Sequence, residues 1–496
     1  MRTTFWTRPD PATPGAANVP AEGAPVARGA GAPPDRPRIA LLAVCAAVTL
    51  LSAALVPLSL PLGWDELVYA SRFAPWSHGV DVPFQAPRTR GVPGLLAPVA
   101  AWSDSTVLLR GWLALLAGAS LYAGFRPWLR VFPHRPWTAP LAAAGYGTLW
   151  ITLFYAASAM PNHYTAMGAT AATACVVRWL RGERARRLLA GAGAGIGVVT
   201  LMRPNDAVWV AGPLLLALLL LRPPGAWRVA AALVAGGAAA AVPWLVESYL
   251  RFDGVRDRLR LASAQQGDVG PQLNLAPLLT SLDGPLLCRP CTGDELFWPA
   301  ALWWVALAAL AVAGTRIAVR AGERTAALLA LAVAGSSAVT YAFLLYYAAP
   351  RFLLTTYALA LVPASLAFHA LWRAARARGR AAAALVAVAV AGHVAFQLTL
   401  VDGHTEIQRG ARGDWPRVAG ALREAGVGPG CVLGGDSAVI PLAYWARCSP
   451  AAHSPGRTPD AVVLKNRAGP PGDDDRWRVS EVEGTYDDRW RIAVPR

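Results

Sequence analysis

The 496-residue chain is 55% hydrophobic and only 15% charged, which excludes an ordinary soluble domain, because such a domain carries about 25% charged residues. Its net charge of +16 would suit a nucleic-acid partner, but the arginines lie in short clusters between apolar segments and form no continuous basic face, so we predict no nucleic-acid binding. Apolar runs long enough to cross the roughly 30 Å hydrocarbon core recur along most of the sequence. The chain is therefore predicted to be an integral membrane protein surrounded by membrane lipids.

Residues 1–38 are predicted to form a disordered cytoplasmic tail. They are rich in proline, alanine and glycine, and such a composition cannot bury a hydrophobic core. The segment is too long and too proline-rich for a simple signal peptide, and no small-residue cleavage site follows at the usual distance. We therefore expect the first apolar run to remain as a membrane helix.

About eleven membrane helices are predicted between residues 39 and 400. They are expected at 39–60, 108–125, 138–156, 163–180, 188–202, 207–221, 229–247, 297–314, 325–343, 352–370 and 381–400. The apolar stretch 91–102 is too short to cross the membrane, which favours a re-entrant or interfacial helix. The predicted fold class is an all-α polytopic membrane bundle.

The arginine clusters predict the orientation of the bundle. With the N-terminus in the cytoplasm, every inside loop is basic, as the positive-inside rule requires. The odd number of crossings then places the C-terminus outside. Three segments are predicted to be exported: 61–107, 248–296 and 401–496. The second of these is arginine-rich, but long loops are translocated largely regardless of charge.

The exported tail 401–496 is predicted to be a small α/β appendage. Its composition becomes abruptly polar, with an amphipathic helical pattern at 417–425 and strand-like runs starting at Cys431 and Ala461. A disulfide between Cys431 and Cys448 is plausible in an exported segment. For Cys288-Arg-Pro-Cys291, a structural disulfide or free thiols are favoured over a redox or zinc site, because no βαβ pattern surrounds the pair and no second pair follows.

The residues most suited to chemistry lie in the first exported loop. Asp65 and Glu66 directly follow the first membrane helix. A carboxylate at the membrane surface is partly desolvated and can serve as a general base. The alternative is that the acidic pair only solvates the end of a helix. The segment Phe84-Gln-Ala-Pro-Arg-Thr-Arg90 then leads into the short apolar stretch.

These parts resemble the GT-C superfamily of polytopic membrane glycosyltransferases. Asp65-Glu66 followed by Tyr69 is similar to the Asp-Glu-x-x-Tyr pattern of family-39 and arabinose-transferase-like members, and residues 84–90 resemble the loop of family-22 mannosyltransferases. The resemblance implies a GT-C-like bundle. It also implies transfer of a sugar from a polyprenyl-phosphate donor to a lipid, glycan or protein acceptor.

The resemblance assigns roles to individual residues. Asp65 becomes the candidate base for an inverting transfer, and Glu66 shares that role or positions the acceptor. Permanently charged guanidinium groups suit the phosphate of the donor, and the candidates for this task are Arg88, Arg90, Arg203 and Arg351. The alternative for each arginine is interfacial snorkelling. Arg351-Phe-Leu-Leu is similar to a motif that opens a late helix in the superfamily.

Three further residues are candidate contacts to acceptor or donor: Tyr69, His78 and His163. A lone histidine such as His163 is more often a satisfied core residue than a catalytic one. No cofactor is required by this reading. Asp65 and Glu66 could bind a divalent metal, but nothing else in the sequence completes a ligand set, so no metal site is predicted.

The sequence therefore predicts a glycosyltransferase acting on the outer face of the cytoplasmic membrane, which transfers a hexose or pentose, with mannose as one candidate. The alternatives are a transporter or flippase of lipid-linked sugars and a non-enzymatic assembly scaffold. An enzyme should gather its charged groups on the outer side, whereas a transporter should line a path between both faces. The enzyme hypothesis predicts Asp65 in one outward-facing cavity with Arg88, Arg203 or Arg351.

Overall fold

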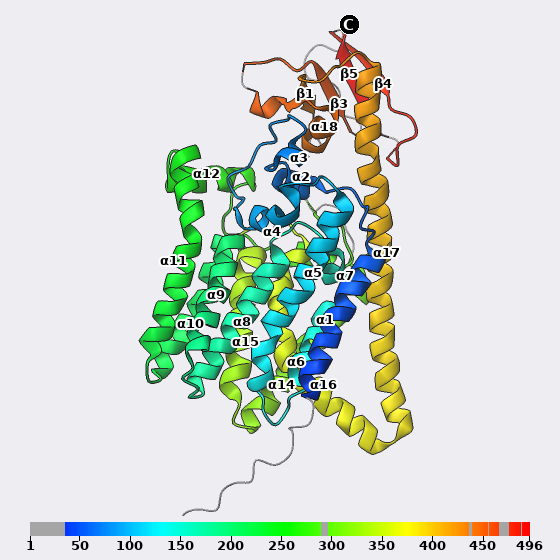
Figure 1. Ribbon diagram of the computed structural model, residues 1–496. Helices are drawn as coiled ribbons and strands as arrows, with labels where there is room; N and C mark the ends of the chain where they lie inside the picture. Colours follow the sequence, from blue (N-terminus) through cyan, green and yellow to red (C-terminus); the bar gives the residue numbers. More distant parts are fainter. Residues whose placement is uncertain (1–34, 289–295, 436–438, 455, 466–475, 488) are drawn as a thin grey trace, which may run out of the picture. The chain divides into compact units, whose positions relative to one another are not determined.

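The computed structural model describes residues 35–288, 296–435, 439–454, 456–465, 476–487 and 489–496 (Figure 1). Residue contacts divide the chain into two units, Met1–Arg36 and Pro37–Arg496. The fold and the sites belong to the second unit. The tail predicted over residues 1–38 falls almost entirely outside the described residues, as does Cys291.

Helices account for most of the described chain. In the first half they are α1 (Arg36–Leu55), α2 (Trp64–Ala70), α3 (Ala74–Ser77), α4 (Gly91–Ala100), α5 (Thr106–Phe125), η1 (Arg126–Arg130), α6 (Thr138–Gly147), α7 (Trp150–Ala156), α8 (Asn162–Leu180), α9 (Arg186–Met202), α10 (Pro204–Leu221) and α11 (Ala226–Arg251). In the second half they are α12 (Val255–Gln265), α13 (Leu275–Thr280), α14 (Trp298–Arg320), α15 (Arg324–Phe343), η2 (Pro350–Leu353), α16 (Leu354–Arg378), α17 (Arg380–Glu424), α18 (Val439–Ala446) and η3 (Ala451–His453).

Within the described residues, eight helices are long and apolar enough to cross a membrane: α1, α5, α10, α11, α14, α15, α16 and α17. The predicted count was about eleven. The segment predicted at 138–156 is broken into α6 and α7, because Leu149 adopts an extended conformation between them. Helix α8 carries polar residues such as Asn162 and His163, and α9 has only 17 residues. The protein is a multi-pass membrane protein, and the described residues contain fewer membrane-length helices than the sequence predicted.

Helix α8 is the buried centre of the bundle, since nearly all of its residues are inaccessible. It packs against α9, α5 and α16. Small residues allow the close approach to α9: a Cβ added to Gly168 would lie 2.7 Å from the carbonyl oxygen of Gly195. Such contacts are typical of helices that associate in lipid. Outer helices instead expose apolar side chains, for example Leu220 and Leu250, as lipid contact requires.

Helix α17 is a single helix of 45 residues. It begins after Gly379, whose φ of +124° suits glycine, and it runs along the bundle to the C-terminal strands (Figure 1). Its first half exposes apolar residues such as Leu385. The boundary predicted at residue 400 lies inside this helix, and the amphipathic pattern at 417–425 belongs to its last turns.

Among the described residues after α17, five short strands form one sheet in the order β2-β1-β3-β5-β4. They are β1 (Val432–Gly435), β2 (Ser449–Pro450), β3 (Ala461–Leu464), β4 (Trp477–Glu481) and β5 (Arg491–Pro495). Strand β1 pairs in parallel with β2 and β3, whereas β5 is antiparallel to β3 and β4. Cys431 and Cys448 form the expected disulfide, and Cys288 is also disulfide-bonded. We call residues 425–496 the α/β unit.

The α/β unit contacts α17 and the first loop. Asp414, buried in α17, accepts hydrogen bonds from the backbone N–H of Tyr486 (2.6 Å) and from Nε1 of Trp490 (3.1 Å). Helix α18 contributes Ile440 and Tyr444 to the hydrophobic cluster of the first loop, which contains α2, α3 and α4. The first loop and the α/β unit therefore share one apolar core.

Candidate active site

The acidic pair lies in the first turn of α2. Negative side chains are favourable there because the helix N-terminus carries a partial positive charge. The two carboxylates bind different partners, and this difference separates their roles.

Asp65 lies between two arginines that come from distant parts of the chain. Its Oδ1 accepts a hydrogen bond from Nη2 of Arg88 at 2.7 Å, and its Oδ2 lies 3.4 Å from Nη2 of Arg351. Burial raises the pKa of Asp65, but the two guanidinium groups outweigh burial and leave that pKa below its usual value. The Asp65 side chain is 32% exposed, whereas both arginine side chains are 9% exposed. The carboxylate is therefore ionised at neutral pH and accessible to a ligand.

Glu66 is enclosed by donors. Its Oε2 accepts from the Gly63 backbone N–H (2.7 Å), Arg110 (3.0 Å) and Arg412 (3.1 Å), and its Oε1 accepts from the Ala159 backbone N–H (2.9 Å) and Arg110 (3.2 Å). Burial alone would raise the pKa of Glu66, but these partners lower it to about 2. With its acceptor capacity used by the protein, Glu66 fixes the position of α2.

Arg110 and Arg412 belong to the candidate site but were not predicted from the sequence. Arg110 is fully buried in α5, and an arginine inside an apolar helix is itself a signal of a specific role. It also donates to the carbonyl oxygens of Leu60 (2.7 Å) and Ala157 (3.0 Å). Arg412 belongs to the polar half of α17, and nothing in the sequence around it predicts its contact with Glu66.

Aromatic rings surround the Arg88 guanidinium. It lies 5.0 Å from the ring centroid of Trp64 and 4.9 Å from that of Tyr69, and its Nε donates to Oε1 of Gln85 at 3.2 Å. Burial raises the pKa of the Tyr69 phenol, so Tyr69 is a neutral hydroxyl beside the Asp65–Arg88 pair.

Arg351 enters the same group from η2. Its Nη1 donates to the Tyr155 hydroxyl (3.1 Å) and to the carbonyl oxygen of Leu286 (2.8 Å). Its buried Nε has no hydrogen-bond partner within the described part of the chain. A buried donor left unpaired is costly, which makes this atom a candidate contact for an anionic ligand.

Arg203 lies near this group without an ion pair to Asp65 among the described contacts. It pairs with Asp206 at 3.2 Å and lies over the rings of Tyr341 and Phe352. The Arg351 guanidinium lies 5.3 Å from the centroid of the same Phe352 ring. Asp65, Arg88, Arg351, Tyr69 and Arg203 thus form one cluster, which we call the Asp65 cluster.

Arg90 is directed elsewhere. Its Nε donates to Glu247 at 3.1 Å, and the same carboxylate binds Arg251 (3.0 Å) and the fully buried Arg258 (3.1 Å). Arg258 also donates to the carbonyl oxygen of Arg88 at 2.8 Å. Arg90, a phosphate-binding candidate in the sequence, therefore contacts Glu247 and has no ion pair with Asp65 among the described residues. The Arg90–Glu247 pair anchors the loop that presents Arg88.

The two histidines lie apart from the Asp65 cluster in their contacts. His163 is buried, and its ring nitrogens are engaged by the Ser120 hydroxyl (2.9 Å) and the Tyr146 hydroxyl (3.1 Å). It is a satisfied core residue, which was the alternative reading. His78 packs edge-on against Tyr444 of α18, with ring centroids 5.2 Å apart. Among the described residues, no three His, Cys, Asp or Glu side chains are grouped as metal ligands.

Solved structures of other proteins have a fold similar to that of this chain. Two structures of ArnT from Cupriavidus metallidurans are similar to this chain over 92% of its length and 97% of theirs. The one bound to undecaprenyl phosphate has a TM-score of 0.59 at 15% identity, and the apo form has 0.60 at 13%.

Two other enzymes have the same fold. The arabinofuranosyltransferase AftD from Mycobacteria has a TM-score of 0.51 at 17% identity, over 92% of this chain and 40% of its own. The Archaeoglobus fulgidus oligosaccharyltransferase AglB, in complex with an inhibitory peptide and a dolichol-phosphate, has a TM-score of 0.50 at 12% identity, over 86% and 69%. No protein-family model and no curated protein sequence matches the chain. At these identities the likeness shows the fold.

Proposed function

We propose that this protein is a membrane glycosyltransferase that moves a sugar from a polyprenyl-phosphate carrier to an acceptor hydroxyl on the outer face of the membrane. The observation that carries the proposal is the contact of the accessible Asp65 carboxylate with the buried Arg88 and Arg351. The fold supports it, because the similar ArnT structure is bound to undecaprenyl phosphate. Mannose is one candidate sugar, and a pentose is another.

The chemistry proposed for the Asp65 cluster is an inverting displacement. The acceptor oxygen forms a bond to the anomeric carbon while the bond from that carbon to the phosphate oxygen breaks, and Asp65 takes the proton of the hydroxyl. The leaving group is a polyprenyl phosphate, whose negative charge the guanidinium groups of Arg88 and Arg351 neutralise. When these arginines turn to the phosphate, they release part of their hold on Asp65 and its pKa rises, which makes it a better base.

The distribution of charge favours an enzyme over a flippase. The elements that carry Asp65 and Arg88, α2 and the loop before α4, lie at the end of the bundle beside the α/β unit (Figure 1). A flippase needs polar groups along a path between both faces. The central helix α8 instead has its buried His163 fully engaged by protein groups.

The test is transfer of radiolabelled sugar from polyprenyl-phosphate mannose or a polyprenyl-phosphate pentose to endogenous acceptors in membranes. Asp65→Asn should lower the rate by about 10²- to 10⁴-fold, the usual contribution of a general base. Asp257→Asn, at an exposed carboxylate paired with Arg260, is the matched control and should retain wild-type activity. Equal transfer by wild type and Asp65→Asn would remove Asp65 from the mechanism. Movement of labelled lipid between leaflets without any sugar transfer would favour the flippase.

A further inference from the structure

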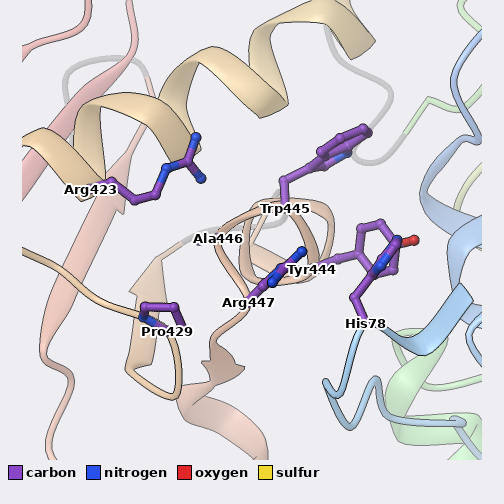
Figure 2. Close-up of a pocket in the computed structure, with 7 residues that line it drawn as sticks. All are labelled: His78, Arg423, Pro429, Tyr444, Trp445, Ala446 and Arg447. Carbon is purple, nitrogen blue, oxygen red and sulfur yellow. The ribbon is translucent and has the colours of Figure 1, made fainter.

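A cavity of about 400 Å³ lies where the α/β unit meets the first loop. It is lined by His78, Arg423, Tyr444, Trp445 and Arg447, among others (Figure 2). His78 follows α3 in the first loop, Arg423 lies in the last turn of α17, and the remaining three belong to or follow α18. Three separate elements therefore contribute to one pocket, and its volume is in the range of small-molecule sites.

The backbone at Arg447, on one side of the pocket, is held in a strained conformation. Arg447 has φ of +57°, a left-handed conformation that costs free energy for a residue other than glycine. Its carbonyl oxygen accepts a hydrogen bond from the Gly430 backbone N–H at 2.9 Å. The disulfide Cys431–Cys448 joins the residues next to these two. Strained backbone conformations cluster at active sites and ligand-binding sites.

The pocket combines two cations with aromatic surface. Neither Arg423 nor Arg447 has an ion pair within the described part of the chain, although each is exposed. Trp445 exposes 36% of its surface, and Tyr444 forms the floor together with the His78 ring. Figure 2 shows Arg423 extending from α17 toward the α18 residues. Solvated surface arginines are common, but two arginines that line one pocket with a part-exposed tryptophan and a tyrosine match a ligand that is both anionic and ring-shaped.

We propose that this pocket binds an anionic saccharide, that is, a sugar unit bearing a carboxylate or a phosphate. The guanidinium groups would bind the anion, and Trp445 and Tyr444 would contact the apolar face of the sugar ring. The identification of this saccharide as part of the acceptor rests on the proposed function. It fits the architecture, because the loop that carries Asp65 also carries His78, and α18 packs against that loop.

The experiment measures equilibrium binding to the full-length protein in nanodiscs, without any donor. The probes are trigalacturonic acid, the neutral trisaccharide maltotriose and inorganic phosphate. Trigalacturonic acid should bind at least tenfold more tightly than either of the others. Arg423→Gln and Arg447→Gly should each weaken its binding about tenfold, as loss of one charge-assisted contact does. Arg447→Gly also removes the backbone strain, so a folding defect is not expected to account for the loss.

Arg478→Gln is the matched control, because Arg478 is an exposed arginine on β4 of the same unit and does not line the pocket. It should bind trigalacturonic acid as wild type does. Equal binding of maltotriose, equal binding of phosphate, or unchanged binding by both pocket variants would overturn the proposal. Asp65→Asn should bind the probe normally. If the wild type binds trigalacturonic acid as expected but transfers no sugar from either donor, the pocket is retained and the proposed function is rejected. If the wild type transfers sugar but does not bind the probe, the pocket alone is rejected.

Discussion

Replacing Glu66 by glutamine tests whether this residue anchors the site rather than acting as its base. The substitution leaves the buried Arg110 and Arg412 without a counter-charge. Each oxygen of the Glu66 carboxylate accepts hydrogen bonds from at least two donors. In either orientation of the glutamine amide, its NH₂ group would therefore face at least two donors and could accept from neither. Lowering the pKa from its usual 4.5 to about 2 corresponds to about 3 kcal/mol, since one unit is ~1.4 kcal/mol. Removing one partner of a buried ion pair costs a similar 3–5 kcal/mol or so.

The assay is thermal unfolding of the purified protein, followed by its intrinsic tryptophan fluorescence. A loss of about 3 kcal/mol should lower Tm by ~3–6 °C, at roughly 1–2 °C per kcal/mol for a chain of this length. The matched variant is Asp65→Asn, which changes the neighbouring carboxylate. Because Asp65 is one-third exposed, this variant should remain close to wild type in Tm while losing transferase activity. A stable Glu66→Gln protein together with an unfolded Asp65→Asn protein would refute the division of roles.

Two further predictions concern charge. The pKa of Glu66 is lower in the folded protein than its usual 4.5, so its contribution to stability is complete above about pH 4.5 and is lost as the pH falls toward 2. Tm of the wild type should therefore fall across this interval, and Glu66→Gln should show a flatter profile; parallel profiles would contradict the assignment. Glu247→Gln should release the loop that presents Arg88, since Glu247 binds Arg90, Arg251 and Arg258, and should raise KM for the donor more than it lowers kcat. Arg260→Gln, at an exposed pair, is its control, and an unchanged KM in Glu247→Gln would argue against the anchoring role.

Local patterns in the sequence predicted much of the fold. Hydropathy identified all eight of the membrane-length helices in the described part of the chain. The strand at Ala461–Leu464 and the Cys431–Cys448 disulfide are present where they were expected. The length of α17 was not predicted, because the composition turns polar at residue 400 while the helix continues. Its glycines and Pro416 would normally interrupt a helix. Tertiary contacts of Arg412 and Asp414 outweigh those local preferences.

The candidate site could be predicted only as far as the types of residue that it contains. Asp65, Arg88 and Arg351 were proposed together and lie in contact. Arg88 and Arg90 were equivalent in the sequence, two positions apart, and what separates them is Glu247, 157 residues away from Arg90. The partner that engages Glu66 from α17 is 346 residues distant. Neither of these long-range pairings can be predicted from the spacing of nearby residues.

Because α17 is continuous, it sets the distance between the acidic pair and the pocket of the α/β unit. The same helix contributes Arg412 to the acidic pair and Arg423 to the pocket of the α/β unit. Eleven residues at 1.5 Å each separate them by about 16 Å along the axis. A continuous helix keeps this separation nearly constant, so it acts as a ruler. An acceptor bound in the pocket at Arg423 would bring its hydroxyl to the acidic pair only if it were an extended chain of several sugars.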